Sequence, residues 1–368
     1  MEQLSPSAQR LKPEAPAVSA DLCHSQHPRV KRPPSAHLRV LQSPLAATAL
    51  AATALRPFLS ACSDMINLVW SILVLVTAEF VVGNFANIFI VLVNYIDWVR
   101  KGKFSFADQI LTALAVSRIG LLWVIIINLF VTVLNPVLQS GKENFFLTAW
   151  LITNHFSTWL AAGLSIFYLL RIANFSNLVF LRLKRRVKSV ILGVLLGTLM
   201  LLLLQIALIA GHEKMRVKEC EENVTWKTEP RDTVYTISNV AVLHLVILVP
   251  FFTSLICFLL LIYSLCKHLR KMQAYSKGSQ DPSTKAHVTA LQTVISFLLL
   301  FAIYSLFVIM SVWLSMGLKK GAFFFSQVIG TLYPSCHAYV LIWGNRKLKQ
   351  AFLSVLGQVK CWLREQKH

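Results

Sequence analysis

The stretch LTALAVSRIGLLWVIII, residues 111–127, is apolar almost throughout and long enough to enter a lipid bilayer. Arg118 lies near its middle. A charged side chain at the centre of a membrane-spanning helix costs about 2.5–3.5 kcal/mol on insertion scales, so it persists where it faces other helices and finds acceptors. The stretch therefore predicts a helix of a membrane bundle with a polar interior.

Apolar segments of this kind recur along the chain. Of the 368 residues, 56% are hydrophobic and only 14% are charged, which is unusually apolar for a soluble domain. Because lipid offers the backbone no hydrogen-bond partners, each long apolar run is expected to be a helix. The predicted fold is an all-α seven-transmembrane-helix bundle. Its spans are 66–95, 110–134, 149–172, 190–210, 234–265, 288–314 and 322–343.

The basic residues predict the orientation of this bundle. By the positive-inside rule, the connecting segments richer in Lys and Arg are cytosolic, which places the N-terminus outside and the C-terminus inside. The net charge of +20 then indicates topology and contact with anionic lipid rather than with nucleic acid. Twenty Lys and Arg lie in 97–108, 171–188, 267–285 and 345–368, and eight lie in 135–148, 211–238 and 315–321.

The two ends of the chain differ from the bundle. Residues 1–64 hold eight of the 13 prolines and show no helical period, so a disordered N-terminal extension is predicted there. It is either a tail of the mature chain or a segment that precedes a true start at Met65. Residues 65–368 form the predicted seven-helix domain. Within it, 345–366 has the apolar stripe of a short amphipathic eighth helix on the inner membrane surface.

Several stretches resemble the type 2 taste receptors, the bitter taste receptors, and the resemblance runs from Met65 to the C-terminus. Rhodopsin-like receptors differ: they have a proline in span six, which 288–314 lacks, and Asn-Pro-x-x-Tyr where this chain has PSCHAYVLIW. Ala338 also departs from the bitter receptors, which usually have serine there. The matching stretches are GNFANIFIVLVN (83–94), VSRIGLLW (116–123), LSIFYLLRIANFSN (164–177), LLLIYSLCKHLRKMQ (259–273), KAHVTALQTVISFLLL (285–300) and YPSCHAYVLIWGNRKLKQ (333–350).

The resemblance implies a G-protein-coupled receptor in the plasma membrane, with no catalytic site and no cofactor. Such a receptor binds small bitter molecules and activates a gustducin-type heterotrimeric G protein. Two alternatives stay open. One is a non-oral chemosensor of the same family. The other is a small-molecule transporter or channel that uses Arg118 and Glu79 within the membrane.

The resemblance also implies a ligand pocket. It places agonist contacts at Trp150 and Asn154, which lie four residues apart on one face of span three. His155, Tyr304 of span six and Gln327 of span seven are further candidates. Taken without the resemblance, Trp150 is better explained as an interfacial residue and Asn154 as a hydrogen bond between helices.

Arg118 predicts an intramembrane polar network. Glu79, Gly83 and Asn87 recur every four residues and share one face of span one, where Gly83 lets a neighbouring helix approach closely. Asn87 is the predicted partner, because the family pattern places it level with Arg118, and His337 of span seven completes the network. Either the network only locks spans one, two and seven together, or it is rearranged on activation.

Two further predictions concern modification and metals. The tripeptide NVT makes Asn223 a candidate glycosylation site in the second outer loop. The histidines of the spans lack the spacing of metal ligands, so no metal site is predicted.

Overall fold

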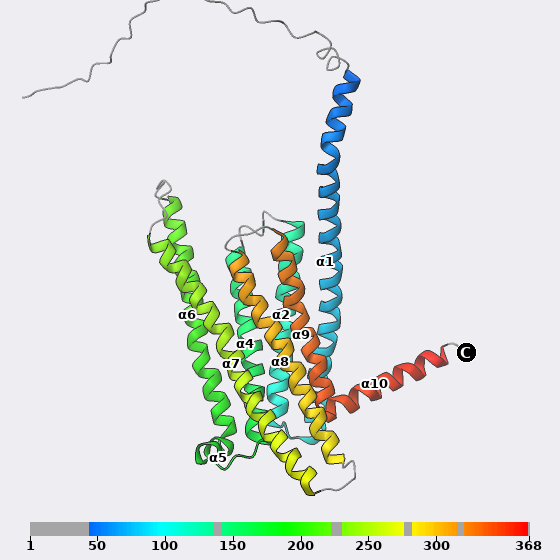
Figure 1. The fold of residues 1–368 in the computed structure, drawn as a ribbon, viewed down its shortest axis with the longest axis vertical. Coiled ribbons are helices and arrows are strands. Elements are labelled where there is room, and N and C mark those ends of the chain that lie inside the picture. Colours follow the sequence, from blue (N-terminus) through cyan, green and yellow to red (C-terminus); the bar gives the residue numbers. More distant parts are fainter. Residues whose placement is uncertain are drawn as a thin grey trace, which may run out of the picture. The chain divides into compact units, whose positions relative to one another are not determined.

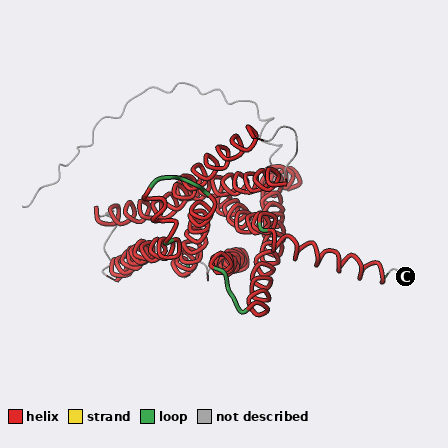
Figure 2. The backbone as a smooth tube through the Cα atoms, turned by 90° about the horizontal axis from the view of Figure 1, so that it is seen from below, coloured by secondary structure: helices red, strands yellow, loops and turns green. Residues whose placement is uncertain are grey.

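The computed structural model describes residues 44–135, 138, 142–221, 230–275, 282–315 and 320–366, whose regular structure is helical. Contacts divide the chain into two units, Met1–Ser63 and Asp64–His368. The helices are shown in Figures 1 and 2 and are α1 (Pro44–Lys101), α2 (Phe106–Leu134), α4 (Glu143–Ile172), α5 (Leu178–Arg185), α6 (Val187–Glu221), α7 (Pro230–Tyr275), α8 (Pro282–Ser315), α9 (Lys320–Gly344) and α10 (Arg346–Glu365).

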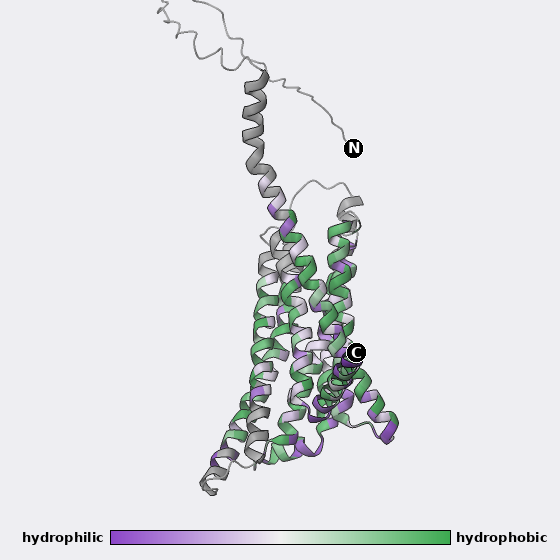
Figure 3. Cartoon of the chain, turned by 90° about the vertical axis from the view of Figure 1, so that its right-hand side faces the viewer, coloured by the Kyte–Doolittle hydropathy of each residue, from purple (hydrophilic) through white to green (hydrophobic). Residues whose placement is uncertain are grey.

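Each of the seven predicted spans lies within one long helix, so the predicted all-α membrane bundle is confirmed. Figure 3 shows hydrophobic residues along much of the length of these helices. By length and hydropathy alone, four described segments could cross a membrane, and they are Ile66–Lys101, Phe106–Leu134, Val187–Gly211 and Val240–His268. The middle of α4 is more polar, because Thr153, Asn154, His155, Ser157 and Thr158 follow one another closely there.

The start of α1 differs from the prediction for residues 1–64. The helix begins at Pro44, so residues 44–64 are helical although disorder was predicted for them. The local composition explains the difference, since alanine is the best helix former and proline suits a first helical turn. Residues 1–43 lie outside the described residues, and the predicted domain boundary stays a prediction.

The main apolar core lies among α2, α4, α7, α8 and α9. Leu114, Phe301 and Tyr304 are completely or almost completely buried in it. The outer surface of α1 instead exposes apolar side chains, with Val74, at 67% exposed, the most open of several. An apolar exterior around a core that contains polar groups is the pattern expected of a helix bundle in lipid.

One end of the bundle contains the end of α9 and the start of α10, and we call it the α10 end (Figure 1). Lys347 Nζ lies 3.3 Å from Asp97 Oδ2 and 2.7 Å from Asp108 Oδ1, so it links α10 to α1 and α2. The side chain of Asn345 accepts hydrogen bonds from the first backbone N–H groups of α10. These contacts fix the start of the predicted eighth helix, which the structure confirms as a helix.

Helices α1 and α9 approach closely at Gly83. A Cβ atom built at Gly83 would lie 2.1 Å from Ser335 Oγ and 2.9 Å from Ser335 Cβ. The Ser335 hydroxyl donates a hydrogen bond to the backbone oxygen of Glu79 at 3.0 Å. Glycine at position 83 therefore allows a hydrogen bond between the two helices that a larger residue would displace.

Gly83→Ala is expected to lower the stability of the folded receptor by about 1–3 kcal/mol, because overpacking forces Ser335 away from Glu79. The measurement is the thermal unfolding midpoint of purified protein in detergent. Gly197→Ala in α6 is the matched control, since a Cβ there meets no described atom within 4 Å. Equal midpoints for the two variants would contradict the importance of this contact.

Candidate functional site

Arg118 of α2 is fully buried and bonds to α9. Its Nη2 donates to the hydroxyl of Tyr333 at 3.4 Å and to Nδ1 of His337. Because a guanidinium can only donate, His337 accepts through an unprotonated Nδ1. The guanidinium carbon also lies 5.3 Å from the centroid of the Tyr333 ring, a cation–π contact.

The structure gives Arg118 different partners from the predicted Asn87. Asn87 is fully buried in α1, but its Nδ2 donates to the backbone oxygens of Gly83 at 2.8 Å and Pro334 at 3.4 Å. Within the described ranges, Oδ1 of Asn87 and the Nε and Nη1 atoms of Arg118 have no hydrogen-bond partner. The structure therefore contains no direct pair between Arg118 and Asn87, because Arg118 directs Nη2 to the acceptors of α9 and leaves Oδ1 of Asn87 unused.

Glu79 also contacts α9, but at other residues than Arg118 does. Its carboxylate accepts a hydrogen bond from the hydroxyl of Thr331, and its backbone oxygen accepts from Ser335. The residues of the predicted network are therefore connected through a shared helix, α9. Glu79, Asn87 and Arg118 each bond to α9, which also contains His337.

Aromatic rings extend this network into the core. The rings of Tyr333 and Tyr304 are stacked with centroids 4.6 Å apart, and Phe301 stacks on Tyr333 at 5.5 Å. The His337 ring lies 5.7 Å from Tyr333 and 4.4 Å from Phe297. Helices α8 and α9 thus meet through a continuous set of rings beside the buried cation.

The hydroxyl of Tyr304 donates a hydrogen bond to Oδ1 of Asn154 in α4. Both residues are about 1% exposed. Two of the predicted ligand residues, which lie 150 positions apart in sequence, are therefore in direct contact. Through the stacked rings of Tyr304 and Tyr333 they are connected to Arg118.

No direct bond between this pair and the other predicted ligand residues is present among the described residues. Trp150 is half-buried and packs with the apolar cluster that includes Leu202 and Ile209 of α6. His155 is almost fully buried, with its ring 6.2 Å from that of Trp159. Gln327 is half-buried, and the described hydrogen bonds of its side chain and carbonyl stay within α9.

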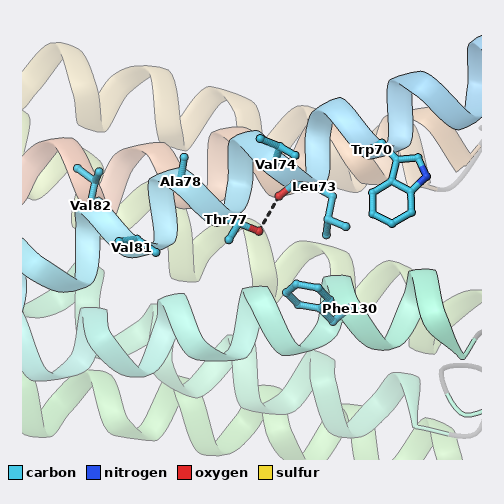
Figure 4. Close-up of a pocket in the computed structure, with 8 residues that line it drawn as sticks. All are labelled: Trp70, Leu73, Val74, Thr77, Ala78, Val81, Val82 and Phe130. Atoms are coloured by element: carbon cyan, nitrogen blue, oxygen red, sulfur yellow. Dashed lines mark hydrogen bonds between the residues drawn. The ribbon is translucent and has the colours of Figure 1, made fainter.

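Two pockets stand out among the described residues, and neither is lined by the predicted ligand residues. One, of about 530 Å³, lies beside the ion pairs at the α10 end. The other, of about 550 Å³, is the apolar groove between α1 and Phe130 of α2 shown in Figure 4. Its one hydroxyl, that of Thr77, donates to the Leu73 carbonyl at 2.7 Å, and the rest of the lining is apolar except for the indole N–H of Trp70.

Two residues that the sequence analysis singled out remain, Asn223 and Ala338. Asn223 lies outside the described residues, so its glycosylation stays a prediction. Ala338 is fully buried next to His337, so the serine hydroxyl usual in the bitter receptors would be buried at this position. Alanine there spares the core one polar group that would need a partner.

Sequence reasoning missed Thr331, Tyr333 and Ser335 of α9. A signal was present, because Thr331 and Ser335 lie four residues apart, as do Tyr333 and His337, in the segment TLYPSCH. Polar groups at such spacing share a helix face, and within lipid that face must meet other helices.

Comparisons with known proteins agree with the geometry. Residues 65–360 match the family described as Taste receptor protein (TAS2R). Taste receptor type 2 member 31 of Pan troglodytes is 59% identical over 295 residues, which cover 80% of this chain and 95% of that protein. Taste receptor type 2 member 46 of Homo sapiens is 57% identical over 304 residues, which cover 82% of this chain and 97% of that protein. The chain therefore belongs to the type 2 taste receptor family, and it is a bitter taste receptor and not an enzyme.

Proposed function

We propose that this receptor binds small bitter molecules from the extracellular side and activates a gustducin-type heterotrimeric G protein at the plasma membrane. The observation that supports it most is the contact series from Asn154 through Tyr304 and Tyr333 to Arg118. It joins a predicted ligand residue to the buried cation by direct contacts across α4, α8, α9 and α2.

The ligand site is proposed near Trp150 and Asn154 of α4, with His155, Tyr304 and Gln327 as the further contacts. An indole offers a broad apolar face with one donor, and an amide can both donate and accept. A few such groups among apolar side chains suit recognition of many small molecules. A ligand that competes for Asn154 would also change the contacts of Tyr304.

The orientation follows from the basic residues. We place the α10 end in the cytosol, with the N-terminus outside, because the exposed Lys and Arg of α5 and α10 gather there. These cations also suit anionic lipid of the inner leaflet. The transporter or channel alternative has no comparable support, since Arg118 is fully buried against Tyr333 and His337.

Calcium imaging tests the whole proposal. Cells that contain the full chain and a taste G protein should respond to members of a panel of bitter compounds, and cells without the G protein should not. A current or flux that persists without the G protein would favour the transporter or channel instead.

Asn154→Ala is expected to raise the agonist concentration for half-maximal calcium response by about tenfold, the effect of losing one well-placed polar contact. Thr153→Val is the matched control, because the described hydrogen bonds of the Thr153 hydroxyl are to carbonyls of its own helix turn, Ala149 and Trp150. An Asn154→Ala receptor that reaches the surface with a full, unshifted response would refute this ligand site.

Tyr333→Phe is expected to raise basal signalling per surface receptor by about twofold or more, because it removes a hydrogen bond to a buried cation but keeps the ring stack. Arg118→Leu should act in the same direction where it reaches the surface. Basal inositol phosphate production, divided by surface antibody binding, is the measurement. Unchanged basal signalling with only reduced surface levels would show that the network merely locks the helices together.

A further inference from the structure

The connection between α4 and α5 is held by the side chain of Lys184. Its Nζ donates to the backbone oxygen of Ala173 at 2.9 Å and to Oδ1 of Asn174 at 3.0 Å. Ala173 is the C-cap residue of α4, so the cation lies where the helix dipole is negative and the last carbonyls need donors. Lys184 also lies 6.0 Å from the centroid of the Phe180 ring.

The same connection is fixed to α7. The backbone N–H of Asn174 donates to Ser264 Oγ at 3.2 Å. The Phe175 ring stacks on Tyr263 at 6.4 Å and meets Phe180 edge-on at 5.0 Å. Three helices therefore converge on residues 173–175, and Lys184 supplies the hydrogen bonds from the α5 side.

Helix α5 depends on these contacts for its position. It has eight residues, none of them buried, and an isolated helix of that length is unstable in water. Asn177 caps its start by accepting from the N–H of Val179. Its first residues, Leu178 and Val179, are 81% and 65% exposed at the α10 end, which we place in the cytosol.

We propose that Lys184 is a positioning residue for G-protein activation. It fixes α5 against α4 and α7, so that the exposed side chains of α5 meet the G protein in a set orientation. Without this contact, α5 would have to become ordered each time the receptor meets the G protein. The entropy lost in that step weakens productive association. The inference rests on the proposed coupling to a heterotrimeric G protein.

The test uses the full-length receptor in lipid nanodiscs with purified gustducin heterotrimer and measures receptor-catalysed nucleotide exchange. The stimulus is the most potent compound of the calcium screen. Lys184→Gln is expected to slow exchange by about three- to tenfold, the effect of losing a charge-assisted hydrogen bond, with the half-maximal agonist concentration nearly unchanged. Lys184→Arg, which keeps the cation, should retain most of the activity.

Two further variants separate positioning from charge and from folding. Lys188→Gln removes an equal charge from an exposed residue at the start of α6, outside the proposed contact surface of α5, and should leave exchange nearly unchanged. Ser264→Ala breaks the link to α7 without changing charge and should slow exchange as Lys184→Gln does, which decides the matter if Lys184→Gln fails to fold.

The outcomes are distinguishable. Equal effects of Lys184→Gln and Lys188→Gln would overturn the positioning role and leave only a surface charge. Unchanged exchange in both Lys184→Gln and Ser264→Ala would overturn it as well. A parent receptor that catalyses no exchange on the heterotrimer would overturn the coupling itself, on which the inference rests.

Discussion

The bundle depends on how a guanidinium is accommodated in its apolar interior. Arg118 bonds to Tyr333 and His337 through one nitrogen, and no carboxylate pairs with it among the described residues. Desolvation of an unpaired cation is costly, so the hydroxyl, the imidazole and the aromatic face of α9 must offset much of the cost. Any movement of α9 relative to α2 changes that solvation, which makes this contact sensitive to helix rearrangement.

Helix α9 is consequently the element on which the other parts are organised. Thr331 and Ser335 bind Glu79, the Pro334 carbonyl binds Asn87, and Tyr333 continues the ring stack into α8. Proline within a membrane helix removes one backbone donor and favours a bend, so α9 can present several faces to its neighbours. Helix α10 follows α9, and Lys347 at its start forms ion pairs with Asp97 of α1 and Asp108 of α2.

The sequence was sufficient to predict the helices but not the side-chain pairs that form between them. Long apolar runs predict spans because the bilayer leaves few alternatives, and all seven were found in long helices. Periodicity placed Asn87 on the face of α1 that meets α9, yet it could not show that Arg118 would donate to Tyr333 and His337 instead of to Asn87. The Asn154–Tyr304 bond joins residues far apart in the chain, and no local pattern determines such a pair. At residues 44–64, alanine content mattered more than the prolines nearby.

The bond between Asn154 and Tyr304 has a consequence for pharmacology. These two groups satisfy each other, so an agonist that engages Asn154 must exchange an existing hydrogen bond for a new one, and the exchange contributes only about 1 kcal/mol to affinity. Affinity at such a place comes mainly from shape and displaced solvent, which favours modest potency across chemically diverse tastants.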